Sequence, residues 1–151
     1  MQPRIGYNKI DPQAVQALMG LGNYVDGCQL ERSLLDLVLV RASQINRCAY
    51  CLDMHTKDAR ASGETEQRLY GLNAWRETPF YSDRERAALA WTEAVTLLTE
   101  SSVPDDIYEQ VREQFDEQEI LKLTMAVITI NSWNRLNVSL RTVPGSYKSR
   151  R

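Results

Sequence analysis

The sequence predicts an all-α fold, a single domain built from about six or seven helices. Apolar residues recur at helical spacing along most of the chain, and no segment shows the strong alternation of a β-strand. Seven glycines and five prolines leave little room for long loops. The 151 residues suit one compact domain, for which we expect an N-terminal arm at 1–10, a helical domain at 11–141 and a C-terminal tail at 142–151.

The composition is that of an ordinary globular protein. A net charge of −2 gives no reason to expect nucleic acid as a partner, and the basic end at 148–151 is too short to change this. The longest apolar runs, 34–40 and 125–130, are too short to cross a membrane, and the first residues lack the apolar core of a secretory signal. Three cysteines, two of them three residues apart, are a poor disulfide framework, so we expect a cytoplasmic protein.

The first two helices follow the arm. Asp11 is expected to cap a helix that has Pro12 in its first turn and ends at Gly27. The second helix is predicted at 30–45, where apolar side chains surround the helix almost completely and predict burial on most sides. Asp36 interrupts this apolar surface, and a buried carboxylate is costly unless it is paired. Asp36 therefore needs either a partner or a function.

A third helix is predicted at 47–62, with Asn46 as its N-cap and Gly63 at its end. Cys48 then lies in the first turn. Unpaired N–H groups and the helix dipole favour a thiolate there, and Arg47 adds a nearby positive charge.

Four further helices are predicted, at 64–75, 83–98, 105–115 and 117–140. Ser82 or Asp83 is expected to cap the helix at 83–98, and Asp116 the helix at 117–140. Residues 143–145 are expected to end the folded part. The last helix has a broad apolar surface formed by Leu121, Met125, Ile128 and Trp133. Such a surface indicates packing between copies of the chain in a homo-oligomer.

Cys48, Cys51 and His55 are the most informative residues of the chain. A helix turns about 100° per residue, which places all three side chains on one stripe about 60° wide. Helical side chains lean toward the N-terminus, so the imidazole is expected to lie over the Cys51 sulfur. A thiol pair with an adjacent base is what dithiol redox chemistry needs.

Two other interpretations of this stretch stay open. Two thiolates and an imidazole are also good zinc ligands, with Asp36 or Cys28 as a fourth. However, structural zinc sites usually divide their ligands between two segments, and here three would come from one helix. The third interpretation is a structural role for small buried thiols and a satisfied histidine. A Cys-x2-Cys motif alone does not exclude it.

Residues 35–55 strongly resemble the alkylhydroperoxidase AhpD core of the carboxymuconolactone decarboxylase-like family. The motif is an acid twelve residues before the first cysteine, then Cys-x2-Cys, then a histidine four residues after the second cysteine. The continuation to Arg60 and the segments 84–91 and 131–136 are similar to the same family, so the resemblance covers roughly residues 10 to 140.

The resemblance implies an all-α bundle that assembles as trimers or hexamers and reduces peroxides. Cys51 matches the cysteine that attacks the peroxide, and Cys48 matches the one that resolves the sulfenic acid to a disulfide. His55, together with Asp36 as the acid, matches the proton relay. The implied partners are an organic hydroperoxide or hydrogen peroxide and a dithiol or thioredoxin-like reductant, with no cofactor and no metal.

The helix dipole and the family disagree about the nucleophile. The dipole favours Cys48 and the family favours Cys51. We prefer Cys51, because the leaning imidazole of His55 can take its proton directly, and a base within reach counts for more than a partial charge one turn away.

Two residues depart from the family pattern. Asp36 stands where the family usually has glutamate, and Tyr50 stands where the original AhpD enzymes have a histidine between the cysteines. A shorter acid and a missing imidazole weaken a proton relay. The alternatives are therefore a thiol–disulfide oxidoreductase without peroxidase activity, or a non-catalytic oligomeric or zinc-binding module.

Overall fold

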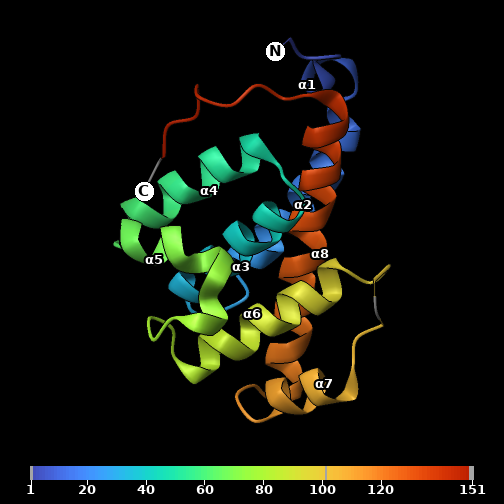
Figure 1. Ribbon diagram of the computed structural model, residues 1–151. Coiled ribbons are helices and arrows are strands. Elements are labelled where there is room, and N and C mark those ends of the chain that lie inside the picture. Colours follow the sequence, from blue (N-terminus) through green and yellow to red (C-terminus); the bar gives the residue numbers. More distant parts are fainter. Residues whose placement is uncertain (1, 101, 150–151) are drawn as a thin grey trace.

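The computed structural model describes residues 2–100 and 102–149. Over these residues the chain is helical and contains no strand, which confirms the predicted all-α, single-domain fold (Figure 1). The elements are α1 (Tyr7–Ile10), α2 (Pro12–Asp26), α3 (Arg32–Ile45), α4 (Ala49–Ala61), α5 (Glu66–Gly71), the 3₁₀-helix η1 (Leu72–Glu77), α6 (Asp83–Thr96), α7 (Asp105–Arg112) and α8 (Glu117–Leu140).

Helix α3 forms the centre of the bundle and packs against α4, α6 and α8. Nine of its fourteen residues are buried, which confirms the prediction of a helix enclosed on most sides. Leu37, Val38 and Val40 are completely inaccessible to solvent. Because α3 leads directly into α4, the buried core fixes the position of the turn that carries the cysteines.

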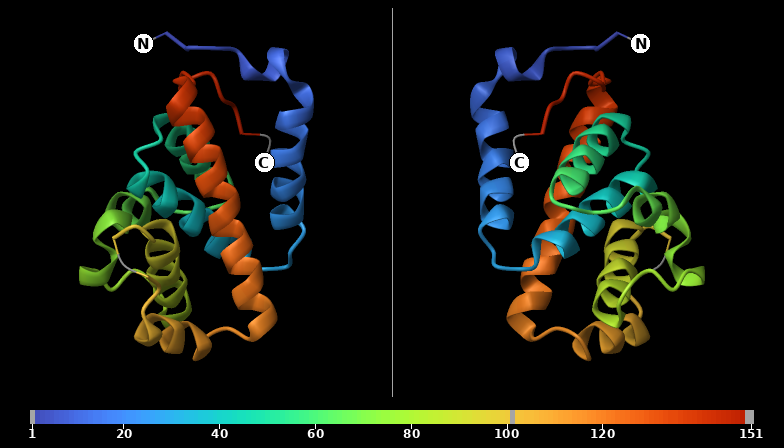
Figure 2. Two further views of the ribbon diagram at one scale, coloured as in Figure 1. Left: turned by 90° about the vertical axis from the view of Figure 1, so that its right-hand side faces the viewer. Right: turned by 90° about the vertical axis from the view of Figure 1, so that its left-hand side faces the viewer.

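Helix α2 runs along one side of the bundle beside α8, as both views of Figure 2 show. Its start was predicted correctly: Asp11 Oδ1 accepts hydrogen bonds from the backbone N–H groups of Gln13 and Ala14, each at 3.1 Å, and Gly27 follows its end. The arm before it is not wholly irregular as expected, because residues 7–10 form one helical turn, α1. Backbone and side-chain bonds from Arg4 to Leu140 and Ser139 hold the arm against the end of α8.

Two capping boxes confirm predicted helix starts. Ser82 and Glu85 form one at α6, and Asp116 and Glu119 form the other at α8. The end predicted for this helix, residue 98, is wrong, since α6 ends at Thr96 and Leu98 beyond it is 57% exposed.

The helix predicted at 64–75 is divided into α5 and η1, with a non-helical Ala74. The guanidinium of Arg86 accounts for part of this break, because it binds the backbone carbonyl oxygens of Trp75, Arg76 and Thr78. These carbonyl oxygens therefore have hydrogen-bond partners without being part of a continuous helix.

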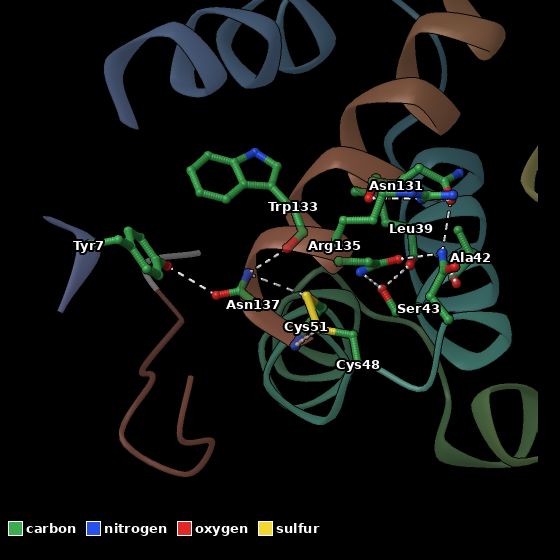
Figure 3. The surroundings of a disulfide bond; sticks show 12 residues. Tyr7, Leu39, Ala42, Ser43, Cys48, Cys51, Asn131, Trp133, Arg135 and Asn137 are labelled. Atoms are coloured by element: carbon green, nitrogen blue, oxygen red, sulfur yellow. Dashed lines mark hydrogen bonds between the residues drawn. A yellow bond between two sulfur atoms is a disulfide. The ribbon is translucent and has the colours of Figure 1, made fainter. Parts of the chain in front are cut away.

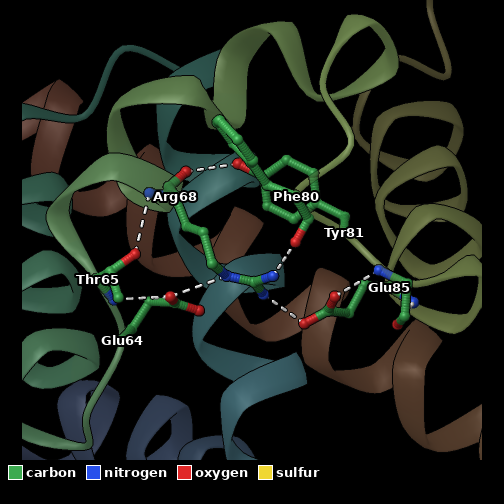
Figure 4. A network of polar contacts seen from close by, with 7 residues as sticks. Glu64, Thr65, Arg68, Phe80, Tyr81 and Glu85 are labelled. Atoms are coloured by element: carbon green, nitrogen blue, oxygen red, sulfur yellow. Dashed lines mark hydrogen bonds and ion pairs between the residues drawn. The ribbon is translucent and has the colours of Figure 1, made fainter.

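Arg68 joins α5 to the start of α6 (Figure 4). Its guanidinium binds Glu64 at 2.9 Å, Glu85 at 2.5 Å and the carbonyl oxygen of Phe80, and its own carbonyl oxygen accepts a hydrogen bond from Tyr81. One side chain thus fixes the connection between two elements.

The segment after α8 continues to pack on α4 beyond residue 145, so ordered contacts extend further than expected. The Gly145 N–H donates to Asp53, the Lys57 ammonium donates to the Tyr147 carbonyl oxygen, and the Tyr147 hydroxyl donates to Asp58. Residue 1 of the predicted arm and residues 150 and 151 of the predicted tail and basic end lie outside the described residues. Among the helices that the structure describes, none combines the length and the apolar character needed to cross a bilayer.

Candidate active site

The turn between α3 and α4 places the two cysteines. Asn46 is the C-cap of α3, Arg47 adopts a left-handed conformation with φ of 54°, and Cys48 is the N-cap of α4. The prediction that Asn46 caps this helix is therefore wrong. Its amide nitrogen instead lies 2.9 Å from Oδ1 of both Asn131 and Asn134 on α8, so a tertiary network replaces the local cap.

Cys48 and Cys51 form a disulfide, with their Cα atoms 5.3 Å apart (Figure 3). The Cys48 sulfur also takes the place of an N-cap oxygen, because it accepts the backbone N–H of Cys51 at 3.3 Å. The side chains are 1% and 0% exposed respectively. The sequence-predicted thiol pair is thus close enough to bond and is shielded from bulk solvent.

A cavity of about 380 Å³ opens beside Cys51. Among the described residues Cys51 lines it and Cys48 does not, although both cysteines are shielded from bulk solvent. The walls are mainly apolar, and a polar group of side chains belongs to the same cavity: Asp26, Arg32, His55 and Asp58. A small molecule held there would lie beside Cys51 and not beside Cys48.

His55 lines this cavity and is only 9% exposed. Burial lowers the pKa of His55 to about 4, the charge of Asp58 opposes this change, and the charge of Arg32 adds to it. The imidazole is therefore neutral at pH 7 and has a free lone pair, although a pKa of about 4 makes it a weak base. Its Nδ1 atom is buried and has no hydrogen-bond partner among the described residues, which is the kind of orphaned polar atom that often marks a functional site. The expected contact with the Cys51 sulfur stays a prediction.

Asp36 is 1% exposed on α3 and pairs with Arg32 one turn earlier, with Nε and Oδ1 3.1 Å apart. Burial raises the pKa of Asp36 to about 6, although the positive charge of Arg32 opposes the rise. Arg32 and Asp58, rather than Asp36, are among the described residues that line the cavity. The proposed relay from Asp36 to His55 also stays a prediction.

Tyr50, the residue between the cysteines, lines the cavity as well. Burial raises the pKa of Tyr50, so its hydroxyl keeps its proton at neutral pH. Sequence reasoning missed other polar residues at this site, among them Tyr7, Asp58 and Asn137. A signal for Asn137 exists in the sequence, because asparagines recur at every third position, at 131, 134 and 137, in the second half of the last predicted helix.

The zinc interpretation finds no support in residues 2–100 and 102–149. No group of three or more histidine, cysteine, aspartate or glutamate side chains there has an arrangement that could hold a metal. Cys28, one of the two candidates for a fourth ligand, is a buried free thiol packed in the main apolar core.

The all-helical bundle and its Cys-x2-Cys pair define a protein of the AhpD-like fold. The chain belongs to the carboxymuconolactone decarboxylase family, whose model matches residues 12–94, more than half of the sequence. It is 43% identical over 140 residues to the uncharacterized protein YdfG of Bacillus subtilis strain 168, covering 93% of this chain and 95% of that protein.

Several solved structures share the fold. Atu0492 of Agrobacterium tumefaciens, a protein of unknown function suggested to be the antioxidant defence protein AhpD, has a TM-score of 0.94 and 43% identity over 97% of this chain and 100% of its own. The debrominase Bmp8 has a TM-score of 0.80 and 18% identity, covering 89% of this chain and 73% of its own, a likeness in fold alone.

Proposed function

We propose that this protein is a thiol-dependent peroxidase of the alkyl hydroperoxide reductase type. The observation that supports this most directly is the placement of the paired Cys51 sulfur at a small apolar cavity that also contains a neutral His55. Membership in the family and the likeness to Atu0492 point in the same direction. We further propose that it acts in the reducing cytoplasm as a trimer or hexamer.

The proposed reaction begins at the dithiol form. His55 takes the proton of Cys51, and the resulting thiolate attacks one peroxide oxygen. The O–O bond breaks, Cys51 becomes a sulfenic acid, and the proton passes to the leaving oxygen, which departs as an alcohol or as water. Sulfur is oxidised by two electrons and the peroxide is reduced by two.

The Cys48 thiol then attacks the Cys51 sulfenic acid, which forms the disulfide and releases one water. An external dithiol, either a small molecule or a thioredoxin-like protein, returns the pair to thiols and is itself oxidised to a disulfide. The net reaction consumes one peroxide and one dithiol, and no metal or cofactor takes part.

Steady-state turnover tests this proposal. Purified protein is mixed with an organic hydroperoxide and a dithiol, and peroxide loss is followed beside the variants Cys51→Ser and Cys28→Ser. We expect turnover in the parent and in Cys28→Ser, whose thiol is in the core away from the cavity, and none in Cys51→Ser. Equal peroxide loss in the parent and Cys51→Ser would reject the proposal.

The second candidate is a thiol–disulfide oxidoreductase without peroxidase activity. The ion pair of Asp36 with Arg32 favours it, because the arginine stabilises the carboxylate and makes Asp36 a poorer proton donor. The burial of both sulfurs does not separate the two candidates, since a protein disulfide and a thioredoxin-like reductant would both need a local opening to reach them. Exchange with a small disulfide in the absence of any peroxide turnover would decide for this candidate.

A further inference from the structure

We propose that Asn137 on α8 is the group that stabilises the Cys51 thiolate, and that Tyr7 of the N-terminal arm orients it. This inference deepens the proposed function by identifying what holds the reacting sulfur, and it rests on contacts that the Cys-x2-Cys motif does not contain. Figure 3 shows the chain of contacts from Tyr7 through Asn137 to Cys51.

Asn137 is buried, with 4% exposure, and each end of its amide has a partner. Its Nδ2 atom donates to the Cys51 sulfur at 3.6 Å and to the backbone carbonyl oxygen of Trp133 at 2.9 Å. Its Oδ1 atom accepts the hydroxyl of Tyr7 at 3.0 Å. The two hydrogens of the amide nitrogen are therefore divided between a fixed carbonyl and the sulfur.

The orientation of the amide follows from these partners. The Trp133 carbonyl oxygen can only accept a hydrogen bond, so the amide nitrogen must face it. A flipped amide would bring two oxygens together and would leave the sulfur beside an acceptor. The Tyr7 hydroxyl satisfies the remaining oxygen, so the donor is held toward Cys51 by a carbonyl on one side and a phenol on the other.

A fixed donor on sulfur acts on the charged form more strongly than on the neutral form. A hydrogen bond to a thiolate is charge-assisted, whereas a thiol is a weak acceptor. The same donor favours Cys51 as the nucleophile toward peroxide and as the leaving group when a reductant attacks the Cys48 sulfur. Asn137 thereby counteracts the dipole at the start of α4, which favours charge on Cys48.

Other charged and titratable groups face the same cavity from α1, α2, α3 and α4. Arg32 favours a thiolate, Asp26 and Asp58 oppose it, and the neutral His55 can exchange a proton with it. The phenols of Tyr7 and Tyr50 complete this set. Because the carboxylates oppose charge on the sulfur, a direct donor is needed there.

A thiol titration without any peroxide tests the inference. The double variant Cys28→Ser, Cys48→Ser retains Cys51 as its single thiol, and thiolate absorbance is followed against pH in this background. Adding Asn137→Ala is expected to raise the midpoint by roughly one pH unit, because the charged form loses its donor. Adding the near-isosteric Asn137→Asp should raise it further, since a carboxylate replaces the donor, and Tyr7→Phe should raise it less.

Asn131→Ala is the matched control, since Asn131 lies on the same helix and binds Asn46 and Thr96 rather than the sulfur. It should leave the midpoint unchanged. An unchanged midpoint in Asn137→Asp, with helical content equal to that of the background, would overturn the inference. Failure of peroxide turnover alone would reject the proposed function and leave this result standing.

Discussion

His55 and Asp36 are buried titratable side chains whose pKa values move in opposite directions. Burial lowers the pKa of His55 from 6.5 to about 4, so the unfolded chain binds this proton between those values and the folded chain does not. His55 therefore contributes stability above pH 6.5 that is lost as the pH falls toward 4. Burial raises the pKa of Asp36 from 3.8 to about 6, so its contribution is present at low pH and is lost as the pH rises through this range.

Removing Asp36 as an acid should make acid unfolding steeper. In the parent the two contributions oppose each other between about pH 4 and pH 6. In Asp36→Asn only that of His55 remains, so the free energy of unfolding should fall more sharply on acidification across this range. Urea denaturation at several pH values measures it. A parent and variant with parallel pH dependence would show that the carboxyl is not perturbed.

The local part of the site was predictable because one helix carries it. Cys48, Cys51 and His55 owe their proximity to spacing along the chain. The contacts of Asn137 and Tyr147 join residues more than 80 positions apart, and no local pattern encodes them. For Asn46 the local pattern was misleading. Its side chain is of a type that often caps helices, but it forms hydrogen bonds with two asparagines of α8 instead.

At the scale of elements, the junction of α5 and α6 depends on Arg68. Its partner Glu64 has a side chain that is only 8% exposed, and Glu85 belongs to the capping box of α6. Arg68→Met keeps most of the aliphatic stem but leaves both carboxylates without this cation. We expect a loss of about 2 kcal/mol in the free energy of unfolding, measured with urea.

Arg60→Met is the control for this experiment. Arg60 pairs with Glu66 across exposed side chains, 57% and 49%, so its loss should cost less than about 1 kcal/mol. Equal costs for the two variants would mean that the Arg68 contacts add nothing beyond an ordinary surface pair.

Helix starts were more predictable than helix ends. Asp11, Ser82 and Asp116 form their caps through neighbouring residues alone, so the sequence contains all the information. The break at Ala74 depends on Arg86 reaching back from α6, and the short α7 ends before the buried Phe115. These ends depend on contacts between elements.

At the scale of the whole molecule, part of α8 carries apolar side chains that the single chain leaves uncovered. Leu121 is 59% exposed and Ile128 is 43% exposed, and their spacing of seven residues places them on one stripe. The bundle itself followed from apolar periodicity, whereas the proposed assembly would use such uncovered surfaces.

The double variant Leu121→Glu, Ile128→Glu should dissociate the proposed trimer or hexamer, because charges would be buried at the interface. Light scattering after size-exclusion chromatography gives the mass, and circular dichroism checks the fold. Tyr70→Glu, on α5 and 70% exposed, should leave the mass unchanged. A monomeric parent, or a double variant with the mass of the parent, contradicts the expected assembly.

The most direct measurement is a single turnover with one equivalent of organic hydroperoxide. Reduced Cys28→Ser protein is mixed with the peroxide and analysed by peptide mass spectrometry, while the released alcohol is quantified. The account predicts one alcohol per chain and a bridge between Cys48 and Cys51, and in Cys48→Ser a sulfenic acid located on Cys51. Persistence of both thiols beside unreacted peroxide, or oxidation at Cys48 without the bridge, would contradict it.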